Sequence, residues 1–281
     1  MTDKKNPFPD ENNTGHIWDD NIRELDNPPP RWWMISFYLS IAWVIGYLIL
    51  YPAIPIGHEP TKGVLDWTSI KEYKEDMAKM VELRKPFEDK ISQLSAKEIL
   101  ANKNLLSYVQ ASSKVLFGDN CAACHGNGGQ GNEDFPILVD DDWLYGGTIE
   151  KIEESITKGR KGNMTAHASI LNSSEIDRLA NSVLAGKVIE NPLYTSKGCV
   201  TCHQPDGTGM HVLGSVNLVD IIYRFKAEDQ LASIKRTITH GVNQVNDKES
   251  REAIMPSFKQ RLTADEIKKL AVYVHEFGGG Q

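Results

Sequence analysis

The chain contains the pattern Cys-x-x-Cys-His twice, as CAACH at 121–125 and as CVTCH at 199–203. The two motifs use all four cysteines of the 281 residues and leave none for a disulfide. Two thiols on one helical turn can reach the two vinyl groups of one porphyrin, and the histidine that follows can bind its iron. The pattern therefore predicts two covalent haem c groups, attached at Cys121, Cys124, Cys199 and Cys202 and ligated by His125 and His203.

Two other kinds of site use closely spaced cysteines, namely redox disulfides and zinc centres. A thioredoxin-like Cys-x-x-Cys does not require the trailing histidine. A single zinc site built from both cysteine pairs leaves the two histidines and the repeat of the sequence unexplained. We therefore expect haem attachment rather than either alternative.

Residues 32–57 form a run without a charged side chain. The first twenty of these, 32–51, correspond to about 30 Å of helix, which is enough to cross the hydrocarbon core of a membrane. A cleaved signal peptide is disfavoured because a long acidic tail, 1–31, precedes the run and no small-residue cleavage site follows it. A buried core helix is disfavoured because the run has no polar face. We expect a transmembrane helix over 32–57.

The overall charge is mildly acidic, with a formal net charge of −7 at pH 7. No polybasic run occurs, which argues against a nucleic-acid partner. Proteins with haem c are matured on the periplasmic face of the bacterial inner membrane. We therefore expect a single-pass protein with its tail in the cytoplasm and its haem domains in the periplasm.

The two motifs belong to a repeat. Beyond the cysteines, whose offset is 78 residues, ILVD at 137–140 matches NLVD at 217–220. SITKG at 155–159 matches TITHG at 237–241, and the helical pattern at 171–183 matches that at 262–274 with an offset of 91. The offset only grows along the chain, as insertions in the second copy require.

Each copy of the repeat ends in an expected amphipathic helix. Asn172 and Thr263 are the predicted N-caps, each with a glutamate three positions later. The apolar positions recur at helical spacing and should pack inward; they are Ile176, Leu179 and Val183 in the first copy and Ile267, Leu270 and Val274 in the second.

The order of these elements resembles the small all-α cytochrome c fold. We expect a mainly α protein, with one N-terminal transmembrane helix followed by two tandem cytochrome c-like haem domains. The expected boundaries are a helical linker at 58–104, domain 1 at 105–187 and domain 2 at 188–281. Domains of this size are too small to rely on side-chain burial alone, so the porphyrin should complete each core.

The second axial ligand of an electron-transfer haem c is commonly a methionine. Met164 and Met255 are related by the offset of the last helix, and each lies in a loop ahead of that helix. They are the expected ligands, Met164 for the first haem and Met255 for the second. Weaker candidates are Met210 and four histidines, for which a surface or supporting role is expected instead; these are His167, His211, His240 and His275.

The tail TGHIWDDNIRELDNPPPRWW at 14–33, the single apolar run after it and DDWLYGG at 141–147 closely resemble the dihaem subunit, CcoP or FixP, of bacterial cbb3-type cytochrome c oxidases. The resemblance covers nearly the whole chain. Two departures stand out: Thr165 follows Met164 where the family usually has proline, and 242–253 reads as a charged insertion without an evident role.

The resemblance implies an electron-transport role in a respiratory chain. Electrons would pass from a donor cytochrome c through the two haems to the monohaem subunit, and then to the catalytic haem b and copper subunit. That subunit would reduce oxygen to water with proton pumping, since this chain offers no oxygen-reducing site. The alternatives are a free-standing membrane-tethered electron shuttle and a dihaem peroxidase; two matched methionines disfavour the peroxidase, which must open a coordination site.

Overall fold

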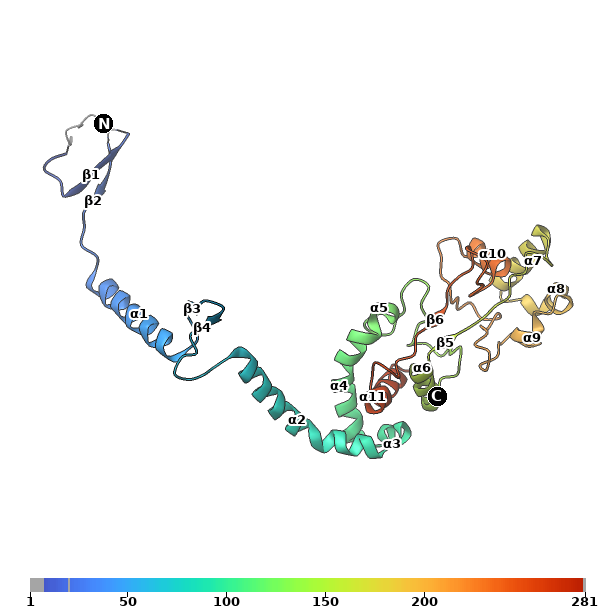
Figure 1. Ribbon diagram of the computed structural model, residues 1–281. Coiled ribbons are helices and arrows are strands. Elements are labelled where there is room, and N and C mark those ends of the chain that lie inside the picture. Colours follow the sequence, from blue (N-terminus) through green and yellow to red (C-terminus); the bar gives the residue numbers. More distant parts are fainter. Residues whose placement is uncertain (1–7, 20, 280–281) are drawn as a thin grey trace. The chain divides into compact units, whose positions relative to one another are not determined.

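The computed structural model describes residues 8–19 and 21–279 and is mainly helical, as predicted (Figure 1). Parts of the predicted tail, residues 1–7 and 20, lie outside the described residues, as do 280–281. The chain divides into two compact units, the first ending at Leu83 and the second beginning at Arg84.

The first unit holds a hairpin and one long apolar helix. Strands β1 (Asn13–Trp18) and β2 (Ile22–Leu25) pair in antiparallel fashion. Helix α1 (Arg31–Leu50) follows, and it buries none of its side chains against the protein. Among the described residues, α1 is the one helix long and apolar enough to cross a membrane.

Helix α1 is shorter than the predicted span of 32–57. Pro52 has no amide hydrogen to donate and disfavours helical backbone at the residue before it. Tyr51 is accordingly extended, with φ −112° and ψ 157°. The rest of the uncharged run leads into a second small hairpin, β3 (Pro55–Ile56) with β4 (Glu59–Pro60).

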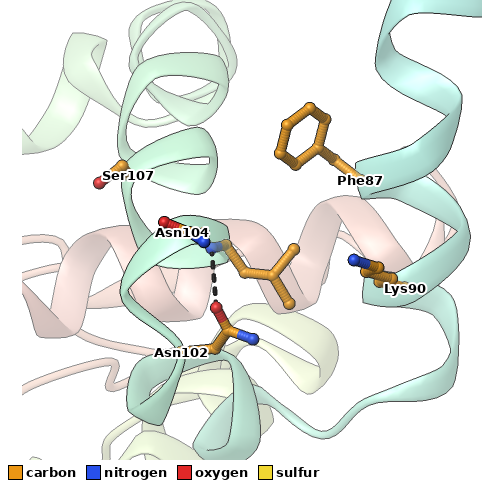
Figure 2. Close-up of a pocket in the computed structure, with 6 residues that line it drawn as sticks. Phe87, Lys90, Asn102, Asn104 and Ser107 are labelled. Atoms are coloured by element: carbon orange, nitrogen blue, oxygen red, sulfur yellow. Dashed lines mark hydrogen bonds between the residues drawn. The ribbon is translucent and has the colours of Figure 1, made fainter.

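The predicted linker, 58–104, is helical from Ser69 onward. Helix α2 (Ser69–Gln93) continues from the first unit into the second, and α3 (Ala96–Ala101) follows it. A groove of about 380 Å³ opens between the last turns of α2 and the start of α4 (Lys103–Asn120) (Figure 2).

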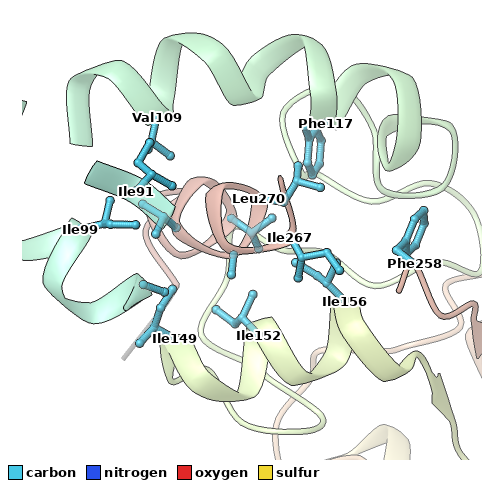
Figure 3. Close-up of a cluster of buried hydrophobic side chains, with 14 of the residues drawn as sticks. Ile91, Ile99, Val109, Phe117, Ile149, Ile152, Ile156, Phe258, Ile267 and Leu270 are labelled. Atoms are coloured by element: carbon cyan, nitrogen blue, oxygen red, sulfur yellow. The ribbon is translucent and has the colours of Figure 1, made fainter. Parts of the chain in front are cut away.

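The first core of the second unit is built around α4. Helix α11 (Ala264–His275) packs against both α4 and α6 (Ile149–Lys158), and the short α5 (Ala122–His125) contacts α4. Figure 3 shows apolar side chains of this core meeting in one cluster. The members of the cluster that have no exposed surface are Ile91, Ile99, Val109, Leu270, Ala271 and Val272.

The second core gathers the remaining helices of this unit. Helix α7 (Ser173–Leu184) packs against α10 (Gln230–His240). The turn η1 (Val188–Glu190) and the short helices α8 (Pro192–Ser196) and α9 (Val200–His203) complete it. Its most buried members are Ala180, Val188 and Tyr194.

The two cores exchange their closing helices. Helix α11 belongs to the second copy of the repeat but packs against α4 and α6 of the first copy. Helix α7 belongs to the first copy but packs against α10 of the second. The predicted inward faces and both predicted capping boxes are present, Asn172 with Glu175 and Thr263 with Glu266.

Each core therefore draws helices from both predicted segments, 105–187 and 188–281, and neither core is a continuous stretch of chain. The first core needs α11 and the second needs α7. The sequence pattern gives the buried face of each helix but not the partner of that face. The two copies therefore interlock within one unit.

Truncating Leu270 in α11 tests the exchange. Leu270→Ala should destabilise the first core by about 2–5 kcal/mol, because the side chain is fully buried there. Hydrogen–deuterium exchange should speed up in α4 and α6 and not in α8. The matched variant Leu179→Ala in α7 should act on α8 and α10 instead. Loss of protection in α10 on replacing Leu270 would contradict the exchange.

Candidate functional site

The first Cys-x-x-Cys-His motif sits where α4 gives way to α5. Cys121 packs at the edge of the first core, and burial raises the pKa of its thiol to about 11. His125, the last residue of α5, has its Nδ1 3.0 Å from the carbonyl oxygen of Pro136. Burial lowers the pKa of His125, although the Pro136 carbonyl opposes that shift.

The second motif repeats this geometry in the second core. Cys199 packs at its edge, and His203 ends α9. Nδ1 of His203 lies 2.9 Å from the carbonyl oxygen of Val216. Burial lowers the pKa of this histidine, and the neighbouring His167 lowers it further against the opposing effect of the Val216 carbonyl.

These two contacts prepare both imidazoles for metal binding. A ring nitrogen beside a carbonyl oxygen carries the proton, so Nε2 keeps its lone pair. Histidines that bind metals commonly hold their other nitrogen in this way, which fixes the tautomer and the orientation of the ring. The four thiols are unpaired, so all remain available for covalent attachment. A haem c group therefore fits the residues present at each motif.

The alternative of one zinc site built from four cysteines does not match this arrangement. The two cysteine pairs belong to different cores. Within residues 8–19 and 21–279, no three His, Cys, Asp or Glu side chains are grouped as metal ligands. The histidines and cysteines instead form two separate and similar sites.

The two candidate methionines lie where the chain crosses between the cores. Strand β5 (Arg160–Lys161), directly after α6, pairs with β6 (Ile254–Met255). Met255 packs against the first core. Met164 forms a corresponding bridge with Val242, directly after α10, with N–H to O distances of 3.2 and 2.9 Å.

Two glycines make these crossings possible. Gly159 ends α6 and Gly241 ends α10, with φ of 71° and 68°. A Cβ at Gly159 would collide with the carbonyl oxygen of Met255, and a Cβ at Gly241 would collide with that of Met164. Only glycine allows this close approach together with a positive φ.

The two methionines lie beside the motifs opposite to those with which the sequence pairs them. Met255 lies in the core that contains Cys121, and Met164 lies beside α10 of the core that contains Cys199. The sequence paired Met164 with the first haem and Met255 with the second because the repeat gives equivalent positions. The sequence does not indicate against which core each methionine loop packs. The exchange of α7 and α11 determines this in the structure.

The other candidate ligands have different surroundings. Met210 lies in a tight turn and pairs with Ser215. His240 contacts Asp247 at 2.9 Å, and His211 is exposed near the carbonyl oxygen of Leu144. His275, at the end of α11, lies 3.6 Å from Glu276.

His167 lies beside the end of α10. Its Nδ1 is buried and has no hydrogen-bond partner among the described residues, and its backbone N–H bonds to the Ile238 carbonyl. Phe258 makes the same backbone bond to Ile156 in the first core. An imidazole therefore occupies in the second core the place that a phenyl ring fills in the first.

Positive charge gathers near His125. Arg251 pairs with Asp134 at 3.2 Å and bonds to Ser233 at 2.7 Å, yet its Nε is buried and has no hydrogen-bond partner in the part of the chain that the structure describes. Arg224 bonds to the Asp134 carbonyl, and burial lowers its pKa to about 10. A buried guanidinium with an unsatisfied N–H suits a carboxylate. The propionate groups of a haem have that chemistry.

The groove in Figure 2 is not part of either site. Its walls contain no cysteine, histidine or methionine, and consist of Phe87, Lys90, Asn102, Asn104, Leu105 and Ser107.

Two family models match the chain over more than half of its length. Residues 10–58 match the N-terminal domain of cytochrome oxidase-cbb3, FixP. Residues 110–181 and 191–274 match cytochrome c oxidase, cbb3-type, subunit III. The second model covers both motifs, both candidate methionines and most of both exchanged helices.

Curated relatives align along nearly the whole chain. The cbb3-type cytochrome c oxidase subunit FixP of Azorhizobium caulinodans is 41% identical over 95% of this chain and 93% of its own length. FixP of Bradyrhizobium diazoefficiens is 37% identical and CcoP of Cereibacter sphaeroides is 34% identical, each over 95% of both chains.

A cluster of four aspartates gives a prediction about pH. Burial raises the pKa of Asp142 to about 6, and Asp220, Asp140 and Asp141 add to the shift. The folded protein thus holds the Asp142 proton more tightly than the unfolded chain, and ionisation costs stability as pH rises from about 4 to about 6. Asp142→Asn removes that cost.

Asp142→Asn should therefore raise the melting temperature at pH 7, and the gain should shrink as the pH is lowered toward 4. Thermal denaturation across this range measures it. Asp119→Asn, at an exposed position outside the cluster, is the control. A gain that is the same at pH 4 and pH 7 would argue against this role of Asp142.

Proposed function

The chain belongs to the FixP and CcoP family of cbb3-type cytochrome c oxidase subunits, and from this membership we propose a dihaem relay within an oxidase. As a member, it is an electron-transfer subunit with cytochrome c domains. The observation that carries the proposal is the matched pair of histidines, each fixed through Nδ1 to a backbone carbonyl in its own core.

We propose that Cys121 and Cys124 hold one haem c group and that Cys199 and Cys202 hold the other. A bound haem c supplies an iron that gains and loses one electron. The protein fixes the imidazoles of His125 and His203, keeps water away through the apolar cores and balances charge. Arg224 and Arg251 are placed to receive haem carboxylates near the first site.

We propose the crossed ligand sets His125 with Met255 and His203 with Met164. What supports them is the packing of Met255 in the first core and the bridge of Met164 to Val242 beside the second. The thioethers of Met255 and Met164 would raise the potential of the haems they bind. The work of the protein is then positioning and tuning rather than bond chemistry.

We propose that the electrons come from a donor cytochrome c and leave toward the monohaem subunit and the catalytic haem b and copper subunit. Helix α1 would anchor the chain in the bacterial inner membrane, with the tail on the cytoplasmic side. The second unit would lie in the periplasm, where haem c is attached. Supporting observations are the apolar surface of α1 and the match of 10–58 to the oxidase family.

The crossed pairing can be tested by combining variants in the full-length protein. His125→Ala should remove the first haem's share of the methionine-to-iron charge-transfer band of the oxidised protein. Adding Met255→Leu should then change nothing, whereas adding Met164→Leu should abolish the band. Mass spectrometry of the protein without substitutions should show two covalently attached haem groups. In a His203→Ala background, adding Met164→Leu should change nothing and adding Met255→Leu should abolish the band. If the two methionine variants exchanged these effects in both backgrounds, the uncrossed pairing would be correct.

A purification experiment tests the partners and the side of the membrane together. A C-terminal tag on this chain should recover the catalytic haem b and copper subunit from solubilised membranes. Protease added to intact spheroplasts should remove the tag and abolish recovery, since the second unit is exposed on the periplasmic side. Recovery of this chain without the oxidase would favour the free-standing shuttle, and a protected tag would refute the orientation.

A further inference from the structure

The charged insertion at 242–253 lies between the two methionine loops, and we name it the strap. The first copy has four residues between Gly159 and Met164, whereas the second copy runs from Gly241 through the whole strap before it reaches Met255. The contacts that hold the strap to α10 include His240 with Asp247 at 2.9 Å, Arg236 with the Glu249 carbonyl at 3.0 Å and Arg251 with the Ser233 hydroxyl at 2.7 Å.

The strap is also ordered internally. The Asn243 N–H bonds to the Arg251 carbonyl at 2.8 Å, and the Arg251 N–H bonds to Gly241 at 3.3 Å. The Gln244 N–H donates to the Ser250 hydroxyl at 3.0 Å. Its residues are therefore in fixed positions relative to the end of α10.

Asn243 connects both methionine loops through one side chain. Its Nδ2 donates to the Gly162 carbonyl at 2.6 Å and to the Ala253 carbonyl at 3.1 Å. Its Oδ1 accepts from the Ala253 N–H at 3.0 Å. Gly162 and Ala253 each stand two residues before a methionine, Met164 and Met255. The carboxamide thus ties the approach to one methionine to the approach to the other.

The backbone at Asn243 suits this task. Its φ is +56°, in the left-handed region that asparagine tolerates better than most residues. This conformation turns the side chain of Asn243 toward Gly162 and Ala253 while its N–H stays paired within the strap.

Gln244 makes a narrower set of contacts. Its Nε2 donates to the Met164 carbonyl at 2.9 Å and lies against the side chain of Asn163. Within residues 8–19 and 21–279, the Gln244 side chain makes no hydrogen bond to the loop that carries Met255. Asn243 therefore contacts both methionine loops, whereas its neighbour Gln244 contacts only the loop that carries Met164.

We propose that Asn243 is a positioning residue for both axial methionines, so that one carboxamide sets the strength of the iron–sulfur bond at both haems. This inference rests on the proposed ligation by Met164 and Met255. A methionine that is held less firmly binds the reduced iron less well, and the potential falls. A tenfold loss of preference for the reduced state lowers a one-electron potential by about 59 mV.

The test uses the full-length, haem-loaded chain and three variants. Asn243→Gly keeps the left-handed backbone accessible and removes the side chain together with its carboxamide. It should lower both midpoint potentials in a redox titration and weaken both contributions to the methionine-to-iron band. Gln244→Ala should affect only one haem, the one that loses its band on replacement of Met164. Val245→Ala, at a side chain that is 92% exposed, should change neither haem.

A second variant guards against a simple loss of folding. Asn243→Asp can still accept from Ala253 N–H but can no longer donate to Gly162, and should also lower both potentials while far-UV circular dichroism stays native. Unchanged potentials in both Asn243 variants, or a change confined to one haem, would overturn the proposal. Failure of the ligand assignment is distinguishable, because Met164→Leu or Met255→Leu would then leave the band intact.

Discussion

The fold of the second unit depends on two loops that cross between its cores, one following α6 and the other following α10. At each crossing a glycine with positive φ lets a methionine carbonyl lie against the end of a helix. Beyond the crossing, each loop leads to the helix that closes the opposite core. The helix partners, the methionine positions and the contacts of the strap all follow from this one exchange.

Local features of this fold could be predicted from the sequence, because they depend on neighbouring residues. The repeat, the capping boxes at Asn172 and Thr263 and the inward faces of α7 and α11 are of this kind. The existence of α1 is another such feature, although the helix ends at Leu50, before Pro52, and not at the predicted position 57. For the site, the two motifs predicted the cysteines and histidines. The carbonyls of Pro136 and Val216 that orient the histidines come from the tertiary fold and could not be predicted.

The exchange could not be predicted because the two copies are chemically equivalent at the positions that matter. Ile176 and Leu179 present the same kind of surface as Ile267 and Leu270, so either helix matches either core by pattern alone. The contacts of the strap could not be predicted either. They join side-chain amides to backbone carbonyls far along the chain, and every residue has such a carbonyl, so the sequence does not indicate which one is bound.

The exchange also has a consequence for the order in which the protein is made. Helix α4 and the first motif are synthesised early, but the helix that closes their core spans 264–275 and is made much later. Synthesis proceeds from the N-terminus, and contacts between distant segments form late. The first core around Cys121 therefore stays open until α11 has emerged, so a group that is to be enclosed in this core can enter it during that interval.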